Sequence, residues 1–156
     1  MSSKIFDTVI VGAGVSGLSC AIELKIKNIE NIAIVEKSNN FFSTIRSFYK
    51  DGKRVDRNWR NQIIELLGNI NFEAGLKEDV LNYFEELLEK YNIKPLYNNE
   101  VEKIIKNQDD IFEVNLKSDI LRAKSVVIAI GKMGKPNKPD YKVPIEIQKS
   151  INFNLD

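Results

Sequence analysis

The sequence predicts an α/β fold with a parallel central sheet and a three-stranded antiparallel meander. Two features predict it: short β-branched runs flank a helical segment near the N-terminus, and several short strands with polar turns follow the longest helical segment. A chain of 156 residues has the length of one domain and can bury about two thirds of its unfolded surface. It is therefore long enough to form a hydrophobic core.

The first predicted unit is a strand, a helix and a second strand. Residues 4–12, KIFDTVIVG, and residues 31–37, NIAIVEK, are apolar and β-branched enough for buried strands. Between them, residues 15–28 predict a helix with one apolar face. That face is formed by Leu18, Ala21, Ile22 and the stem of Lys25. Because a helix connects the two strands, we expect them to be parallel.

The middle of the chain predicts one tight turn and one strong helix. Asp51–Gly52 predicts a hairpin turn between SFYK and KRVD, because both turn positions favour positive φ. Residues 77–92 predict the strongest helix, whose acidic start complements the helix dipole. Its apolar positions recur at intervals of three and four residues: Val80, Leu81, Phe84, Leu87, Leu88 and Tyr91.

Five strand-like segments follow this helix: IKPLYN, EVEKIIKN, IFEVNLKS, DILRAK and SVVIAIG. Three of them alternate like a surface meander, whereas SVVIAIG is apolar throughout and predicts a strand buried on both faces. All prolines but Pro95 lie in the tail. We therefore divide the chain into a domain over residues 1–135 and an extended, Pro-rich linker over residues 136–156.

The composition excludes several classes of protein. With 23 basic and 22 acidic residues the formal net charge is +1, so we expect no nucleic-acid partner. The absence of histidine excludes a Ser-His-Asp triad and a histidine metal site, and we expect no metal. The single Cys20 excludes an internal disulfide and fits a small buried apolar residue. No secretory signal or membrane-length run is found, so we expect a cytoplasmic protein without a membrane partner.

Three glycines follow the first predicted strand in the order G-x-G-x-x-G. In a Rossmann-like βαβ unit the first glycine, here Gly12, makes the tight turn. The second, Gly14, lets the backbone approach a pyrophosphate, and the third, Gly17, lets helix and strand pack closely. The loop and first helical turn, with Ala13, Val15 and Ser16, are then expected to face the phosphates of a bound dinucleotide. The alternative is a purely structural glycine loop.

An acidic residue at the end of the second strand supports dinucleotide binding. Glu36 follows Gly14 by 22 positions (36 − 14), close to the spacing of about 20 expected for the carboxylate that binds a ribose. Lys37 is included as its neighbour in the cofactor site. The alternative for Glu36 is a solvated charge at the end of a strand.

Three segments together carry a family resemblance: VIVGAGVSGLSCAIEL, IAIVEK and SVVIAIGKMGKPNKPDY. They resemble the N-terminal FAD domain of the pyridine nucleotide-disulfide oxidoreductase superfamily, near its thioredoxin-reductase-like and flavin-containing monooxygenase-like branches. The resemblance covers almost the whole chain. It implies a Rossmann-like FAD-binding domain that is incomplete at its C-terminal side.

The resemblance also implies further cofactor contacts. An ATG-like segment of the family corresponds to Ala129, Ile130 and Gly131, with Ile130 in place of the usual threonine. The backbone of Val101 corresponds to the family's adenine contact. FFSTIRSF resembles the segment that runs past the flavin, which adds Ser43 and Thr44 to the site.

The function that the resemblance implies is that of an NAD(P)H-dependent flavoprotein oxidoreductase. NAD(P)H would bind a second domain that this chain does not contain, and hydride would pass to the flavin and on to an unknown acceptor. We expect the chain alone to be inactive and to hold FAD poorly. Catalytic residues stay unknown, and a homodimer of the full-length protein is left open.

Two questions stay open at this point. The segment RSFYKDGKRVDRNWRNQ, with Trp59 and Arg60, either lies near the flavin or forms an exposed hairpin. The glycine spacing also fits a non-catalytic module that holds ADP, NAD or FAD, because the same loop binds each of these dinucleotides or nucleotides.

Overall fold

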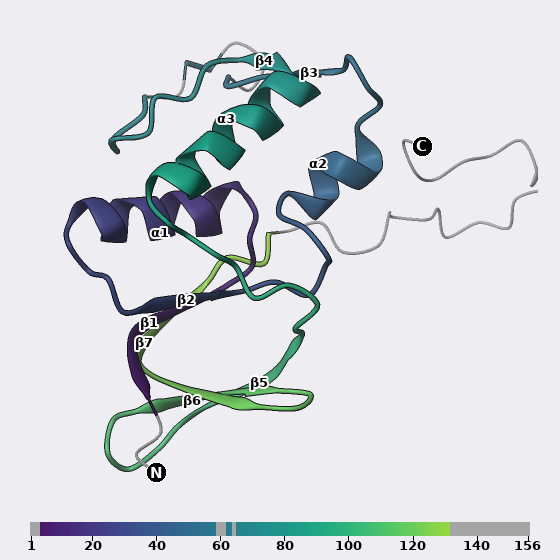
Figure 1. Cartoon of the computed structure of the whole chain (residues 1–156). Coiled ribbons are helices and arrows are strands. Elements are labelled where there is room, and N and C mark those ends of the chain that lie inside the picture. The colour runs from purple at the N-terminus through teal and green to yellow at the C-terminus, as the bar shows by residue number, and fades with distance from the viewer. Residues whose placement is uncertain (1–3, 59–61, 64, 132–156) are drawn as a thin grey trace, which may run out of the picture.

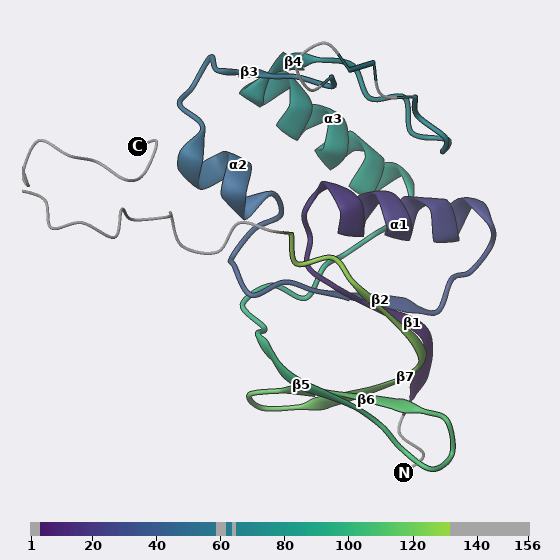
Figure 2. The ribbon, with the colours of Figure 1, turned by 180° about the vertical axis from the view of Figure 1, so that it is seen from behind.

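The computed structural model describes residues 4–58, 62–63 and 65–131. In chain order the elements are β1 (Ile5–Val11), α1 (Val15–Ile26), β2 (Ile32–Val35), α2 (Ser43–Phe48), β3 (Arg54–Val55), β4 (Gly75–Leu76), α3 (Lys77–Lys90), β5 (Val101–Lys106), β6 (Phe112–Leu116) and β7 (Ile120–Ile128). Helices α1 and α3 lie on one side of β1 and β2, and β5 and β6 lie on the other side (Figure 1). The same layers are seen from behind in Figure 2.

The main sheet has five strands in the order β2-β1-β7-β6-β5. Strand β1 pairs in parallel with β2 on one side and with β7 on the other. Strands β5, β6 and β7 form the predicted antiparallel meander. In the register of the parallel part, Val11 lies opposite both Val35 and Ile128. The carboxyl ends of three parallel strands therefore meet at one edge, and the predicted α/β fold is confirmed.

Strand β7 joins the meander to the parallel sheet. Its residues Ile120–Ala123 pair with β6, and Arg122–Ile128 pair with β1. The prediction of two separate strands, DILRAK and SVVIAIG, is therefore wrong. No turn-forming residue interrupts the run, and the hydroxyl of Ser125 donates a hydrogen bond to the carbonyl of Asp7 (2.8 Å), which holds the junction extended along β1.

The prediction that this strand is buried on both faces is also wrong. Val126 and Val127 are half-buried, and Ile128 is 65% exposed. Val127 packs against the apolar cluster on the helix side of the sheet and Val126 against the cluster on the meander side, so the described residues cover each face only in part.

Two apolar clusters hold these layers together. The first lies between the sheet and the helices and includes Ile10, Leu18, Ile22, Ile34 and Phe84. The second lies between the parallel strands and the meander, around Val9, Val35, Val114 and Ala123. Neighbouring residues of β1 enter different clusters because side chains alternate between the two faces of a strand.

The predicted helices match the structure closely. The buried residues of α1 include Leu18, Ala21 and Ile22, as its apolar face requires. In α3 the buried residues are Val80, Leu81, Phe84 and Leu88, whereas Leu87 and Tyr91 are half-buried. The carboxylate of Asp79 accepts a hydrogen bond from the backbone N–H of Leu76 (3.2 Å) at the start of α3.

Two local predictions need correction. The turn at Asp51–Gly52 exists, with φ +70° at Gly52, but it does not form a hairpin. It links α2 to β3, and β3 pairs with β4 instead, because the preceding residues are helical. The IKPLYN strand reduces to one parallel bridge between Leu96 and Val35. The linker predicted over residues 136–156 lies outside the described residues.

Within the described ranges, none of the helices has both the length and the apolar character needed to cross a membrane.

Among the described residues, Phe84 is the largest fully buried side chain, and it lies in the helix-side cluster. It is 1% exposed, and the centroid of its ring lies 4.6 Å from that of Phe42 and 5.4 Å from that of Tyr83. We expect Phe84→Ala to lower the free energy of unfolding by about 3–5 kcal/mol, because it removes buried contacts and leaves a cavity. Urea denaturation measures this change. The exposed neighbour Glu85→Ala serves as control and should change it by less than about 0.5 kcal/mol.

Candidate functional site

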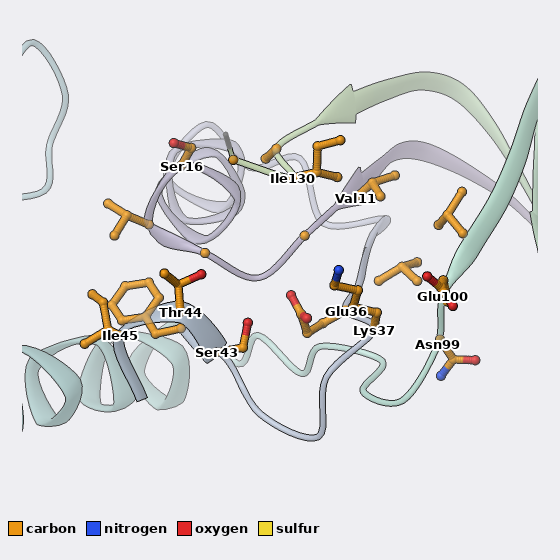
Figure 3. A pocket seen from close by; sticks show the side chains of 18 residues that line it. Val11, Ser16, Glu36, Lys37, Ser43, Thr44, Ile45, Asn99, Glu100 and Ile130 are labelled. Atoms are coloured by element: carbon orange, nitrogen blue, oxygen red, sulfur yellow. The ribbon is translucent and has the colours of Figure 1, made fainter. Parts of the chain in front are cut away.

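A cavity of about 590 Å³ lies at the edge where the parallel strands end. Its walls come from the β1–α1 loop, the end of β2, the start of α2, the start of β5 and the residues after β7. Figure 3 shows Ser43 and Thr44 on one side of the glycine loop, with Glu36 and Lys37 beside it and Asn99 and Glu100 farther along. Ligands of α/β proteins bind at this edge of the sheet.

The three glycines of the loop differ in what surrounds them. Gly12 has φ +104°, and a Cβ placed on it would lie 2.5 Å from the carbonyl oxygen of Ala129. A Cβ on Gly17 would overlap the carbonyl oxygen of Gly12. A Cβ on Gly14 would meet nothing within 4 Å. Gly12 and Gly17 are therefore required by the fold, whereas Gly14 keeps space open at the cavity wall.

Helix α1 directs its N-terminus at this open space. Its N-cap is Gly14, in an extended conformation and without a side chain that could bond to the first N–H groups. The first turn contains no acidic residue. The N–H groups of a first helical turn have no partner within the helix, and the helix dipole adds partial positive charge there. The site is therefore suited to an anion such as a phosphate.

Glu36 is a buried carboxylate that connects two loops. It is 6% exposed, so the alternative of a solvated charge at the end of a strand is wrong. Its Oε2 accepts a hydrogen bond from the N–H of Ala13 (2.8 Å), and its Oε1 accepts one from the N–H of Ser38 (2.8 Å). A carboxylate has about four lone-pair sites, so each oxygen can still accept a bond from a ligand hydroxyl.

The backbone of Glu36 extends the same network. Its N–H donates to the carbonyl of Leu96 (3.0 Å), and its carbonyl accepts from the N–H of Asn99 (2.9 Å). Asn99 lines the cavity. One residue therefore holds together the glycine loop, the β2–α2 connection and the segment before β5.

The other end of the cavity is formed by α2 and the residues that precede it. Phe42 adopts a left-handed conformation with φ 55°, and its N–H donates to the carbonyl of Ala13 (3.0 Å). A positive φ is unusual for a bulky residue. Because the ring of Phe42 is buried, the surrounding packing holds the backbone in this conformation. Helix α2 begins at the next residue and carries Ser43 and Thr44 into the cavity wall.

The structure brings most of the predicted site residues together. Those that line the cavity are Gly12, Gly14, Val15, Ser16, Glu36, Lys37, Ser43, Thr44, Val101, Ala129 and Gly131. Ala13 and Gly17 are buried behind the cavity wall and support it from there. Gly131 has φ +69°, a left-handed conformation that favours glycine. Trp59 and Arg60 lie outside the described residues.

Sequence reasoning missed several lining residues. These are Val11, Val35, Phe42, Ile45, Asn99, Glu100 and Ile130. Val11 and Val35 end parallel strands, so their place at the edge of the sheet could have identified them. Asn99 and Glu100 carried no signal, because the chain brings them to the cavity through backbone pairing with β2.

Two titratable groups that do not line the cavity have a raised pKa. Burial raises the pKa of the Tyr97 phenol, so this group stays neutral at physiological pH. Burial also raises the pKa of the Cys20 thiol, and this side chain packs against the helix-side core as a small residue would. In the part of the chain that the structure describes, no cluster of side chains could hold a metal ion.

A comparison with protein families gives one match. The sequence model of the family described as "Pyridine nucleotide-disulphide oxidoreductase" matches residues 9–154, which is nearly the whole chain. A comparison with curated protein sequences finds no match.

The solved structures with a similar fold include proteins bound to FAD or NADP and a disulfide reductase. A crystal structure of OTEMO with FAD and NADP aligns with a TM-score of 0.67 and 18% identity over 90% of this chain and 28% of that chain. The bacillithiol disulfide reductase Bdr (YpdA) from Staphylococcus aureus aligns with a TM-score of 0.59 and 24% identity over 82% and 39%. A cyclohexanone monooxygenase mutant from Rhodococcus sp. Phi1, bound to NADP+, aligns with 0.67 and 21% over 89% and 28%.

The TM-scores of 0.59 to 0.67 establish the likeness of the fold. The chain spans 28% to 39% of the length of these three proteins.

The different surroundings of Gly14 and Gly17 can be tested by two matched substitutions. An alanine in place of a helical glycine ordinarily stabilises a protein by about 1 kcal/mol. We expect Gly17→Ala to destabilise the chain instead, by about 1–3 kcal/mol, because its Cβ overlaps backbone that cannot move freely. Gly14→Ala should stay within about 0.5 kcal/mol of the natural chain. Urea denaturation of both variants decides; equal stabilities would contradict the packing role of Gly17.

Proposed function

Because this chain belongs to the pyridine nucleotide-disulphide oxidoreductase family, we propose that its cavity binds FAD as the flavin-binding part of an NAD(P)H-dependent oxidoreductase. The observation that carries the proposal is the open space at Gly14, beside a helix N-terminus and the buried carboxylate of Glu36. A diphosphate and a ribose hydroxyl pair need these two features at this spacing.

Each part of the dinucleotide has a matching part of the cavity. The diphosphate would lie against the backbone of Gly14, Val15 and Ser16, where the first N–H groups of α1 have no partner within the helix. The adenosine ribose would donate its hydroxyls to Glu36, and the adenine would lie toward Val101. This order leaves the cavity end at Ser43, Thr44 and Gly131 for the flavin.

The residues of this chain bind and orient in this proposal, whereas FAD, when bound, supplies the redox chemistry. Residues 1–135 are proposed as the FAD-binding domain. The hydride donor would be NAD(P)H, bound by a part of the full-length protein outside this chain. The fold likeness to proteins solved with FAD and NADP supports this assignment, and the electron acceptor stays open.

Substitution of Gly14 by valine tests whether the open space receives a diphosphate. We expect Gly14→Val to weaken ADP binding at least about 100-fold, about 2.7 kcal/mol, because its branched side chain occupies the position of the diphosphate. Isothermal titration calorimetry with ADP measures this. Unchanged ADP affinity in the folded variant would rule out the proposed position of the diphosphate.

Addition of NADPH to the full-length protein separates an enzyme from a non-catalytic nucleotide module. For an oxidoreductase, flavin bound to the full-length protein is reduced when NADPH is added, and its absorbance near the flavin maximum is lost. Binding of ADP without any flavin in the full-length protein would instead favour the non-catalytic module.

Glu36→Gln tests the ribose contact. We expect it to weaken ADP binding by about 1.5–3 kcal/mol, because a neutral amide replaces charge-assisted hydrogen bonds. Glu100→Gln is the matched control: this carboxylate also lines the cavity, but it is exposed and its ion pair is with Lys117 at 3.7 Å. Equal effects of the two variants on calorimetric affinity would show that Glu36 acts only through the charge of the cavity.

A further inference from the structure

Helix α2 forms one wall of the cavity without being anchored by its own core residues. It is only six residues long, Ser43–Phe48, and none of them is buried. Three of them, Ser43, Thr44 and Ile45, line the cavity. Ile45 is half-buried against the helix-side cluster, and the other contacts that set the position of α2 lie at its two ends.

The N-terminal end of α2 is tied to the glycine loop. Phe42 donates its N–H to the carbonyl of Ala13 (3.0 Å) and buries its ring against Phe84. Arg46, one turn into the helix, donates from Nε to the carbonyl of Phe41 (2.9 Å). These contacts fix the start of α2 but not its direction.

The C-terminal end of α2 is bound by the ammonium of Lys77. Its Nζ donates to the carbonyl of Tyr49 (2.7 Å), contacts the carbonyl of Arg46 (3.4 Å), and pairs with a carboxylate oxygen of Asp51 (3.0 Å). An ammonium has three N–H donors, so these contacts account for all of them. The Lys77 side chain is only 12% exposed, whereas that of Asp51 is 92% exposed.

The position of Lys77 at the start of α3 does not account for the burial and contacts of its ammonium group. Lys77 is the first residue of α3, where the helix dipole disfavours a positive charge. The carbonyls at the end of α2, by contrast, attract a cation. Figure 1 shows α2 beside the N-terminal end of α3. The hydrogen bonds from Lys77 Nζ to the carbonyls of Arg46 and Tyr49 join these two helix ends. The favourable contacts of Lys77 are thus those made to α2 and the turn after it.

The backbone of Lys77 is itself held in place by α3 and by a hydrogen bond to Lys53. Its own N–H donates to the carbonyl of Lys53 (2.8 Å), and the next turn of α3 places Val80 and Leu81 in the core. The end of α2 is therefore held against a helix that is itself anchored in the core.

We propose that Lys77 is a positioning residue of the cavity. Its ammonium fixes the C-terminal end of α2 and so places Ser43 and Thr44 along the part of the ligand that lies beyond the diphosphate. This inference rests on the proposed function, because it assumes that the cavity holds a dinucleotide. It assigns Lys77 a selective effect: the residue supports binding of FAD, which reaches α2, and not binding of ADP, which ends at the diphosphate.

The test compares Lys77→Met with Lys77→Arg and with Lys90→Met, a matched loss of charge at the exposed opposite end of α3. Hydrogen exchange of residues 43–49, followed by mass spectrometry in the ligand-free chain, reports on α2 directly. We expect exchange about tenfold faster in Lys77→Met, since a charge-assisted hydrogen bond of about 1.4 kcal/mol corresponds to a factor of 10. Lys90→Met should exchange like the natural chain, and Lys77→Arg should lie between the two.

Calorimetry with ADP and FAD gives the second readout. In the natural chain we expect weak but measurable binding of both nucleotides; in Lys77→Met the affinity for FAD should fall about tenfold, while that for ADP stays within about twofold. If circular dichroism shows that Lys77→Met is unfolded, Lys77→Gln, which keeps a donor but no charge, takes its place with the same expected pattern.

The outcomes separate this inference from the proposed function. Unchanged exchange in α2, or equal losses of ADP and FAD affinity, would overturn the role of Lys77 even if nucleotides bind. If the natural chain binds neither ADP nor FAD, the proposed function fails, and with it the ligand-positioning role, whatever the exchange experiment shows. Faster exchange together with a selective loss of FAD affinity supports both.

Discussion

The site depends on one close approach, in which the backbone of the β1–α1 corner packs directly against the end of β7. Gly12 and Gly17 have no room for a side chain there, because the carbonyl oxygens of Ala129 and Gly12 occupy it. This contact brings the start of α1 over the edge where β1, β2 and β7 end. The helix N-terminus and the ends of the strands then face the same cavity, and an anion meets N–H groups instead of side chains.

Glu36 makes the surrounding loops into one unit. Loops usually carry their own conformational freedom, and a binding site built from them loses affinity when they must be ordered. Here a buried carboxylate accepts hydrogen bonds from the glycine loop and from the β2–α2 connection, and the backbone of the same residue bonds to the segment before β5. The polar half of the cavity is therefore organised before a ligand arrives.

The half of the cavity that α2 forms is organised in a different way. Helix α2 has no buried residue and depends on Phe42 at one end and Lys77 at the other. A charged side chain thus performs at the C-terminus of α2 what core packing performs for α1 and α3. The two halves of the site differ in what holds them, and so they are expected to differ in how readily they move.

Local signals were sufficient for much of this protein. The period of the apolar residues predicted α1 and α3, because the buried face of a helix is formed by residues three and four apart. The glycine spacing and Glu36 predicted the cavity wall, because both follow from the geometry of one βαβ unit. Residues that reach the site through pairing between distant segments could not be found in this way. Asn99 and Glu100 lie at the cavity because their segment bonds to β2, and Lys77 faces α2 because α3 packs beside it. The continuity of β7 likewise depended on pairing with both β6 and β1. The exposure of Ile128 depended on the lack of a second described strand beside that end of β7. Short-range periodicity indicates which face of each segment is buried. Which segments contact one another is determined only by strand pairing and packing in the assembled structure.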